Sequence, residues 1–280
     1  MGETEESTRG LANASGFPFQ IWLGSYIDRT SEQHGWRVLT SEIRWMNQRT
    51  GREEFADLVL AHEPLSTFRV RAVVEVKRVR EGVWVFLKAD RPSDKVQRLR
   101  AFACCAGTSG TIRARWVDGY RSSRGENCLV SSFCVVRGQG KERPMLERLA
   151  SYVLLAAESI GEREAKLWDA SKLLVFPIIV TNAQLVVHTF DPEQIDPQSG
   201  EMKESQFTKV PYILFRKSIG TVYSTGKQLH YLPGLNAQDE RDVLIVNSMH
   251  VVDALKMLSF FNNFDGFDPY WKECNLLEEF

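Results

Sequence analysis

Residues 69–79 read Arg-Val-Arg-Ala-Val-Val-Glu-Val-Lys-Arg-Val, and this stretch carries the strongest indication of the fold. Its apolar centre is nearly continuous, which is typical of a strand that is buried on both faces of a sheet. Two charged residues, Glu75 and Lys77, interrupt the apolar run. Because they are two positions apart, both side chains point to one face of the predicted strand.

Two more strands are predicted directly before this one. Residues 36–45 are rich in β-branched and aromatic types, and residues 54–61 are apolar around Asp57. Short links join the three segments, so we expect an antiparallel meander. A buried carboxylate without a partner is costly, so Asp57 needs one. If the strands around Asp57 and Glu75 are neighbours, both carboxylates and Lys77 can converge at one end of the sheet.

The rest of the chain predicts further helices and strands. Residues 17–33 have helical periodicity, and residues 144–168 give the strongest helix signal, with an apolar stripe that includes Tyr152. Residues 93–105 are compatible with a helix. The other expected elements are a strand at 127–136, a strand at 172–180, a turn at 181–183, a return strand at 184–190, strands at 210–215, 220–223 and 243–246, and a helix at 248–261.

This order predicts an α/β protein with a central mixed sheet flanked by helices. We expect residues 1–16 to be a disordered tail. Residues 17–190 would form the core, with an irregular insertion at 90–140. Residues 191–280 would form a C-terminal α+β extension packed on that core.

Composition limits the class of protein. The chain has 280 residues, a formal net charge of -1 and 43% hydrophobic residues, so it can bury a large core without disulfides. No apolar run is long enough to cross a bilayer, and the polar, acidic N-terminus does not resemble a secretory signal. We therefore expect a cytoplasmic protein that does not contact membranes. Basic residues crowd the stretch from Arg69 to Arg124, which is compatible with nucleic-acid binding or with an ordinary solvated face.

The charged residues in the two apolar strands suggest a chemistry. Two carboxylates suit Mg²⁺, which prefers oxygen ligands and keeps several waters. A nearby ammonium can orient an attacking water or stabilise charge on a phosphate. The alternative is purely structural: Glu75 and Lys77 could neutralise each other, and a neighbouring arginine could hold Asp57.

The order Asp57, then Glu75-Val-Lys77, on consecutive strands after a helix resembles the PD-(D/E)xK, restriction-endonuclease-like superfamily. The order of helix, three strands, helix and two strands, αβββαββ, resembles the shared core of that family over residues 17–80 and 144–190. The family motif has proline before the first aspartate, whereas this chain has Ala56. The resemblance implies that Asp57, Glu75 and the backbone carbonyl of Val76 bind Mg²⁺, or Mn²⁺ as a substitute. It also implies that Lys77 is the catalytic lysine.

Many members of this family carry a glutamate on the first helix, and here that helix offers Gln20 and Asp28. Glu42, on the first strand, is a candidate substitute. Gln20 fits a role in the site and a role as a polar core residue or cap equally well.

The function that the resemblance implies is a metal-dependent endonuclease that cuts DNA in preference to RNA, with a role in defence against foreign DNA. A homodimer or a partner protein is compatible with this function. The alternative is a nuclease-like scaffold without catalysis, or a nucleic-acid-binding module. An enzyme of another class built on the turn at Thr181 and Asn182 has no residue pattern behind it.

Overall fold

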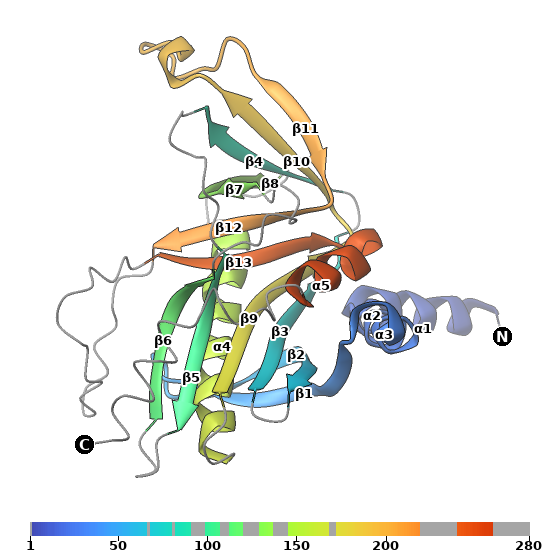
Figure 1. Ribbon diagram of the computed structural model, residues 1–280. Helices are drawn as coiled ribbons and strands as arrows, with labels where there is room; N and C mark the ends of the chain where they lie inside the picture. The colour runs from blue at the N-terminus through green and yellow to red at the C-terminus, as the bar shows by residue number, and fades with distance from the viewer. Residues whose placement is uncertain are drawn as a thin grey trace, which may run out of the picture.

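The structure is a computed structural model, and it describes residues 2–65, 68–79, 82–90, 99–106, 112–119, 129–136, 145–167, 172–218 and 240–259. The described residues form a large mixed sheet flanked by helices and a smaller second sheet beside it (Figure 1). The predicted α/β class with a central mixed sheet is therefore confirmed. No helix among these residues is long and apolar enough to span a membrane.

Helices and strands alternate irregularly along the chain. The helices are α1 (Gly2–Ser15), α2 (Phe17–Arg29), α3 (Ser31–His34), α4 (Met145–Leu167), α5 (Val251–Ser259) and the short 3-10 helices η1 (Pro192–Gln194) and η2 (Ser248–His250). The strands are β1 (Arg37–Asn47), β2 (Arg52–Leu65), β3 (Phe68–Lys77), β4 (Val83–Ala89), β5 (Leu99–Ala106), β6 (Ile112–Gly119), β7 (Val130–Ser131), β8 (Phe133–Val136), β9 (Lys172–Thr181), β10 (Gln184–Phe190), β11 (Gln206–Val210), β12 (Tyr212–Ser218) and β13 (Glu240–Asn247).

The first three strands form the predicted meander. β1 pairs with β2 and β2 with β3, both antiparallel. β3 then pairs in parallel with β9 over its whole length, from Phe68 opposite Lys172 to Lys77 opposite Thr181. Parallel neighbours need a crossover connection. The 23-residue helix α4 lies within this connection and packs on the sheet.

β9 is the centre of the large sheet, and its other edge is shared by two strands. β5 pairs with residues 172–175 of β9, and β13 pairs with residues 178–181. Pro177 lies between these two stretches, where β9 changes partner. Proline has no N–H to donate to a ladder, so the change of partner is a position that tolerates it.

Several expectations about individual elements were wrong. The described part of 93–105 is a strand, β5, because all its side chains from Ala101 to Cys105 are buried against β9 and α4 rather than along one helix stripe. β10 is not the return strand of β9, since it pairs with β4 and β11 in the second sheet. Residues 2–15 form helix α1 rather than a disordered tail. The strand expected at 220–223 lies outside the described residues.

The segments expected to be an insertion and an extension contribute to the main sheet. β5 and β6 come from residues 90–140, and β12 and β13 come from residues 191–280. The strand order is β1-β2-β3-β9-β13-β12-β7, with β5 and β6 attached through β9. The C-terminal part is thus hydrogen-bonded into the sheet, in addition to packing against it.

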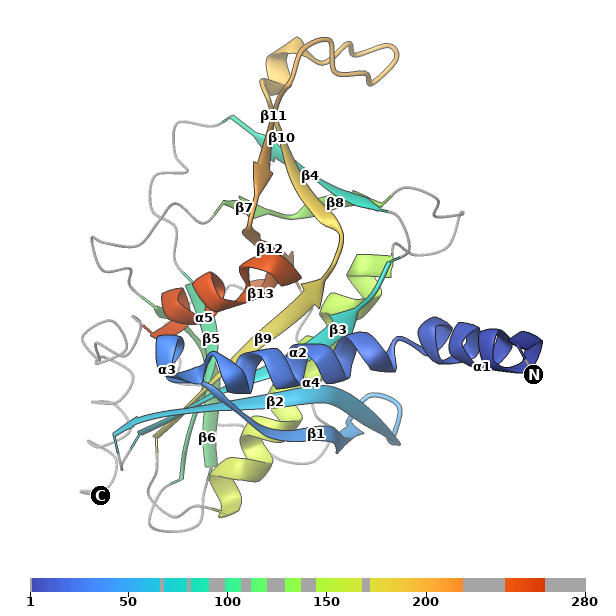
Figure 2. The ribbon, with the colours of Figure 1, turned by 90° about the vertical axis from the view of Figure 1, so that its right-hand side faces the viewer.

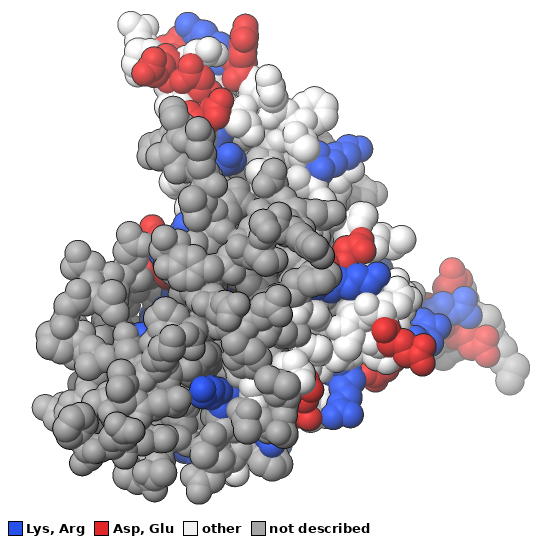
Figure 3. All heavy atoms as spheres, viewed as in Figure 1, with Lys and Arg blue, Asp and Glu red and all other residues white. Residues whose placement is uncertain are grey.

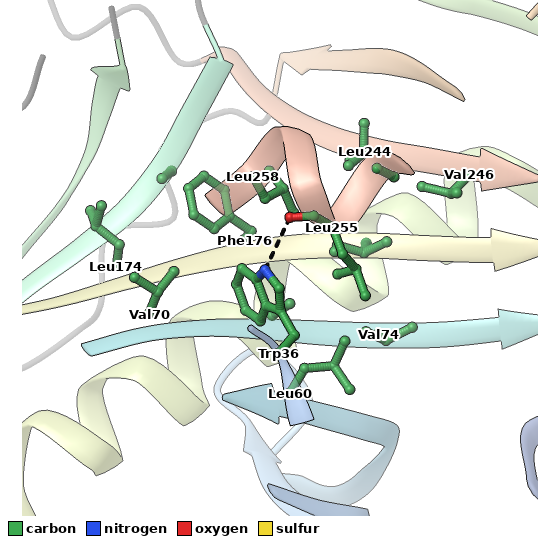
Figure 4. Close-up of a cluster of buried hydrophobic side chains, with 14 of the residues drawn as sticks. Trp36, Leu60, Val70, Val74, Leu174, Phe176, Leu244, Val246, Leu255 and Leu258 are labelled. Atoms are coloured by element: carbon green, nitrogen blue, oxygen red, sulfur yellow. Dashed lines mark hydrogen bonds between the residues drawn. The ribbon is translucent and has the colours of Figure 1, made fainter. Parts of the chain in front are cut away.

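Two apolar layers hold the helices to the sheet. α4 buries Leu146, Leu154 and Ile160 on one face. α2, α3 and α5 cover the other face, where Trp36 is fully buried. The indole N–H of Trp36 donates to the carbonyl of Leu255 at 3.1 Å, which ties the start of β1 to α5 (Figure 4).

Two parts project from this body. α1 points away from the sheet beside α2 (Figure 2), and its described side chains from Glu5 to Ser15 are exposed. β10 and β11 extend into an arm at the upper end of Figure 1. Charged side chains, mostly acidic, gather at the far end of this arm (Figure 3). The exposed acidic residues there are Asp191, Glu193, Glu201 and Glu204.

Candidate active site

The predicted site lies where the β2–β3 ladder ends and the β1–β2 ladder is interrupted at one pair. On one side, β1 pairs with β2 through Ser41–Leu58 and Ile43–Ala56, but Glu42 and Asp57 between them are unpaired. On the other side, the β2–β3 ladder reaches only the Leu58–Val74 pair at this end. Asp57 therefore lies at a break in one ladder and just beyond the end of another. Backbone groups at such breaks need other partners.

Side chains supply those partners. The carboxylate of Asp57 reaches across to β3, where its Oδ2 accepts a hydrogen bond from the backbone N–H of Val76 at 2.7 Å. Gln20 on α2 donates from Nε2 to the backbone carbonyl of Asp57 at 3.0 Å. In the register of the β2–β3 ladder, the position opposite Asp57 is Glu75. The meander thus brings the first carboxylate next to the second, as the sequence predicts.

Glu42 joins the same cluster from β1. Its Oε1 accepts a hydrogen bond from Gln20 Nε2 at 2.6 Å, so one amide group contacts both Glu42 and Asp57. Glu42 has a φ of 51°, in the left-handed region that a residue with a Cβ enters only at a cost. Such outliers concentrate at functional sites. Gln20 is buried, as a polar core residue would be, and it also contacts two residues of the predicted site.

Tyr152 approaches the site from α4. Its hydroxyl accepts from the backbone N–H of Phe55 at 3.1 Å and also donates to the carbonyl of Phe55, two residues before Asp57. The ring packs edge-on against Trp45 at a centroid distance of 5.2 Å. The sequence places Tyr152 in an apolar stripe but gives no indication that its hydroxyl reaches this part of β2.

The end of β3 is held by another side chain. Beyond the last ladder pair, the Oδ1 of Asn182 accepts from the backbone N–H of Val79 at 2.7 Å, and its Nδ2 donates to the carbonyl of Val79 at 2.8 Å. Asn182 follows Thr181, the residue paired with Lys77. The turn at Thr181 and Asn182 therefore fixes the chain just after the predicted catalytic lysine.

The carboxylates of the site repel one another. Burial, more than the neighbouring Asp57 and Glu42, raises the pKa of Glu75 to about 8, although Lys77 opposes this shift. Burial also raises the pKa of Asp57 to about 6, with a further contribution from Glu42, while the hydrogen bond from Val76 acts in the opposite direction. Two partly buried carboxylates and that of the exposed Glu42 thus lie near one ammonium, and the site has an excess of negative charge when they are ionised.

The purely structural reading is not supported by the contacts. No ion pair within 4.0 Å joins Lys77 to Asp57 or Glu75 among the residues that the structure describes, and no arginine there contacts Asp57. Glu75 has no hydrogen-bond partner in the same part of the chain. The arrangement leaves the carboxylate oxygens of Glu75 and the second oxygen of Asp57 able to bind another group.

The donor set fits a hard divalent cation. Carboxylate and carbonyl oxygens are the ligands that Mg²⁺ prefers, and a Mg²⁺ site commonly uses only one or two carboxylates. In the described ranges no three His, Cys, Asp or Glu side chains are already arranged to hold a metal ion. Asp57, Glu75 and the carbonyl of Val76 are the groups that could do so, with Glu42 as a fourth.

Part of the basic stretch does not form a surface. Arg71 is buried, and its Nε bonds Glu164 of α4 at 2.8 Å. Arg100 is also buried and bonds the carbonyl of Glu240 at 2.8 Å. These two side chains connect elements of the core. Arg80, Arg91, Lys95, Arg98, Arg121 and Arg124 lie outside the described residues.

Comparison of the chain with models of known protein families, with curated proteins and with solved structures finds no match in any of the three. What the fold and the site define is therefore an α/β protein with three carboxylates and a lysine clustered on its first three strands.

Proposed function

We propose that this protein is a metal-dependent phosphodiesterase of the PD-(D/E)xK type that cuts nucleic acid, DNA in preference to RNA. The observation that carries the proposal is the convergence of Asp57, Glu75 and Lys77 on diverging strands without mutual ion pairs. The order of α2, the meander β1–β3, α4 and the parallel strand β9 supports it, since a restriction-endonuclease-like core begins in this way.

In this proposal each residue has a separate role. Asp57, Glu75 and the carbonyl of Val76 hold Mg²⁺, which when bound lowers the pKa of a coordinated water and stabilises charge on the phosphate. The ammonium of Lys77 lies on the same face of β3 as Glu75 and orients the attacking water or binds a phosphate oxygen. Gln20 keeps Glu42 and the Asp57 backbone in place through its two hydrogen bonds.

The experiment is an incubation of the purified full chain with supercoiled plasmid, single-stranded DNA and RNA. Each substrate is tested with Mg²⁺, with Mn²⁺ and with EDTA. We expect metal-dependent cleavage that falls by at least about 10²-fold in Asp57→Asn and Lys77→Ala, because the first removes a ligand of the metal and the second removes the ammonium that acts at the phosphate. Glu193→Gln, on the exposed arm, is the control and should cut at the wild-type rate.

Two results would overturn the proposal. One is cleavage that survives in both Asp57→Asn and Lys77→Ala. The other is the absence of cleavage with any metal and substrate when the wild-type chain is folded. Tight DNA binding in the second case would instead support the alternative, a nucleic-acid-binding module without catalysis.

A further inference from the structure

We propose that Asn182 is a positioning residue for Lys77, and that its side chain continues the β3–β9 ladder beyond the last strand pair. This inference rests on the proposed nuclease function, because it assigns Lys77 a task that depends on its exact placement. Its geometric part can be tested without any activity.

The backbone around Lys77 lies at the end of both ladders of β3. Lys77 is the last residue of β3, and its pair with Thr181 is the last one in the β3–β9 ladder. On the other side the ladder to β2 has already ended at Val74. A strand end with a neighbour on one side only opens locally at less cost in free energy than a strand paired on both sides. Its position must therefore come from other bonds.

The side-chain amide of Asn182 bonds both backbone groups of one residue just beyond β3. It accepts from the N–H and donates to the C=O of the same residue, Val79, at 2.7 and 2.8 Å. A side-chain amide has the same donor and acceptor as a peptide group, so this contact acts as one more rung of the ladder. Lys77 thus forms the last true ladder pair, and a side-chain rung follows it two residues later.

The turn that carries Asn182 is itself held in place by hydrogen bonds. Thr181 is fully buried, and its Oγ1 accepts from the N–H of Ala183 at 3.1 Å. The amide of Asn247, at the end of β13, donates to the carbonyl of Ala183 at 2.7 Å. The turn is therefore fastened to the centre of the sheet, and Asn182 transmits that fixed position to β3.

Asn182 contributes to the position of Lys77 more than to the stability of the fold. Asn182 is exposed, so its two bonds satisfy groups that water could otherwise reach, and such bonds contribute little to folding. The ammonium of Lys77, in turn, has no ion pair within 4.0 Å among the described side chains. Its placement depends on the backbone that Asn182 holds, which makes Asn182 more important for Lys77 than for the fold.

The kinetic test compares two alanine variants at asparagines whose side chains each make two hydrogen bonds. Asn182→Ala frees the end of β3, whereas Asn47→Ala removes bonds to Arg49 and Glu54 in the β1–β2 turn. With plasmid and Mg²⁺, we expect Asn182→Ala to lower kcat by about 10²-fold with KM unchanged, as for a misplacement of about 1 Å. Asn47→Ala should lower thermal stability and leave kcat unchanged.

A double-mutant cycle distinguishes positioning from a general loss of structure. In a Lys77→Ala background, Asn182→Ala should cause no further loss of kcat, because residues that act as one unit are not additive. If instead the fold-losses in kcat of the two single variants multiply in the double variant, the two residues act independently and the proposal is overturned.

Amide hydrogen exchange tests the geometry even if the wild-type chain cuts nothing. We expect exchange at Arg78 and Val79 to be faster in Asn182→Ala than in wild type, and unchanged in Asn47→Ala. Unchanged exchange in Asn182→Ala would overturn the inference whether or not the proposed function holds. Faster exchange with an unchanged kcat would overturn the positioning role while leaving the nuclease proposal intact.

Discussion

At the scale of single residues, the site combines several arrangements that cost free energy. Glu42 has a left-handed backbone, and Asp57 and Glu75 are carboxylates placed next to each other in a partly buried space. Gln20 is a buried amide that holds two of these groups. A chain selected only for stability would not be expected to combine these features, and strain of this kind is typical of sites that bind or react.

The raised pKa of Glu75, about 8, predicts how stability depends on pH when no divalent metal is present. The folded chain binds this proton more tightly than the unfolded chain, so the free energy of unfolding falls as pH rises through the range between the two pKa values. Glu75→Gln imitates the protonated form. In EDTA it should be more stable than wild type at pH 8 by more than about 1.4 kcal/mol, the equivalent of one pKa unit.

Urea denaturation at several pH values between 5 and 8 would measure this difference. Glu193→Gln, on the exposed arm, is the matched control and should give no pH-dependent difference from wild type. If the difference in the free energy of unfolding between Glu75→Gln and wild type were the same at every pH in this range, the prediction would be contradicted. Added Mg²⁺ should reduce this difference in the free energy of unfolding, because a cation that binds the carboxylates of the folded wild-type chain stabilises it.

At the scale of elements, α4 lies in the connection between β3, which carries Glu75 and Lys77, and the central strand β9, and it also contacts the strand that carries Asp57. Tyr152 bonds the backbone of β2, and Glu164, near the end of the helix, bonds Arg71 on β3. Because α4 is fixed at two separate points, it cannot shift along the sheet without breaking a bond.

The Arg71–Glu164 pair predicts an asymmetric mutational response. Both side chains are buried, so Glu164→Ala leaves a buried guanidinium whose remaining partners among the described residues are the carbonyl of Val70 at 3.1 Å and Glu63 at 3.4 Å, and it should cost about 3 kcal/mol. Replacing both residues, as in Arg71→Met with Glu164→Met, should cost less than that single change. Arg37→Ala, which removes an exposed pair with Glu63, should cost less than about 1 kcal/mol.

Thermal or urea unfolding of the three variants would check this order. A double variant that is less stable than Glu164→Ala would show that the pair stabilises the fold more than apolar packing does. That outcome would contradict the prediction.

At the scale of the whole molecule, the N-terminal and C-terminal parts of the chain share one core. β13 lies between β9 and β12, and α5 receives the indole N–H of Trp36 from the other end of the sequence. Figure 4 shows side chains from β3, β9, β13 and α5 around that indole. The residues after 190 therefore complete the central sheet.

Two truncations test this integration. A chain that ends at Phe190 lacks β13 and α5, so it exposes one edge of β9 and the Trp36 pocket, and we expect it not to fold cooperatively. A chain that begins at Gly16 lacks only α1, whose described side chains are exposed, and it should unfold at nearly the same urea concentration as the full chain. Circular dichroism in urea would compare them. Cooperative unfolding of the chain that ends at Phe190 would contradict the prediction.

The local sequence of residues 36–79 contains much of the site. Apolar, β-branched and aromatic composition identifies the three strands, and short links make them neighbours, so the meeting of Asp57 and Glu75 follows from the pairing of adjacent strands. The long helix and the apolar strand after it are also predicted, because each has a strong periodicity or composition of its own.

Only the tertiary structure determines which distant strands pair and which side chains meet across them. The sequence of β5 does not reveal its partner, and β10 follows β9 directly yet joins another sheet. The contacts of Tyr152 and Asn182 with the site depend on segments about 100 residues away in sequence. Local patterns specify the type of an element and its buried face, whereas its partner is chosen by competition among all the exposed edges and apolar surfaces of the folded chain.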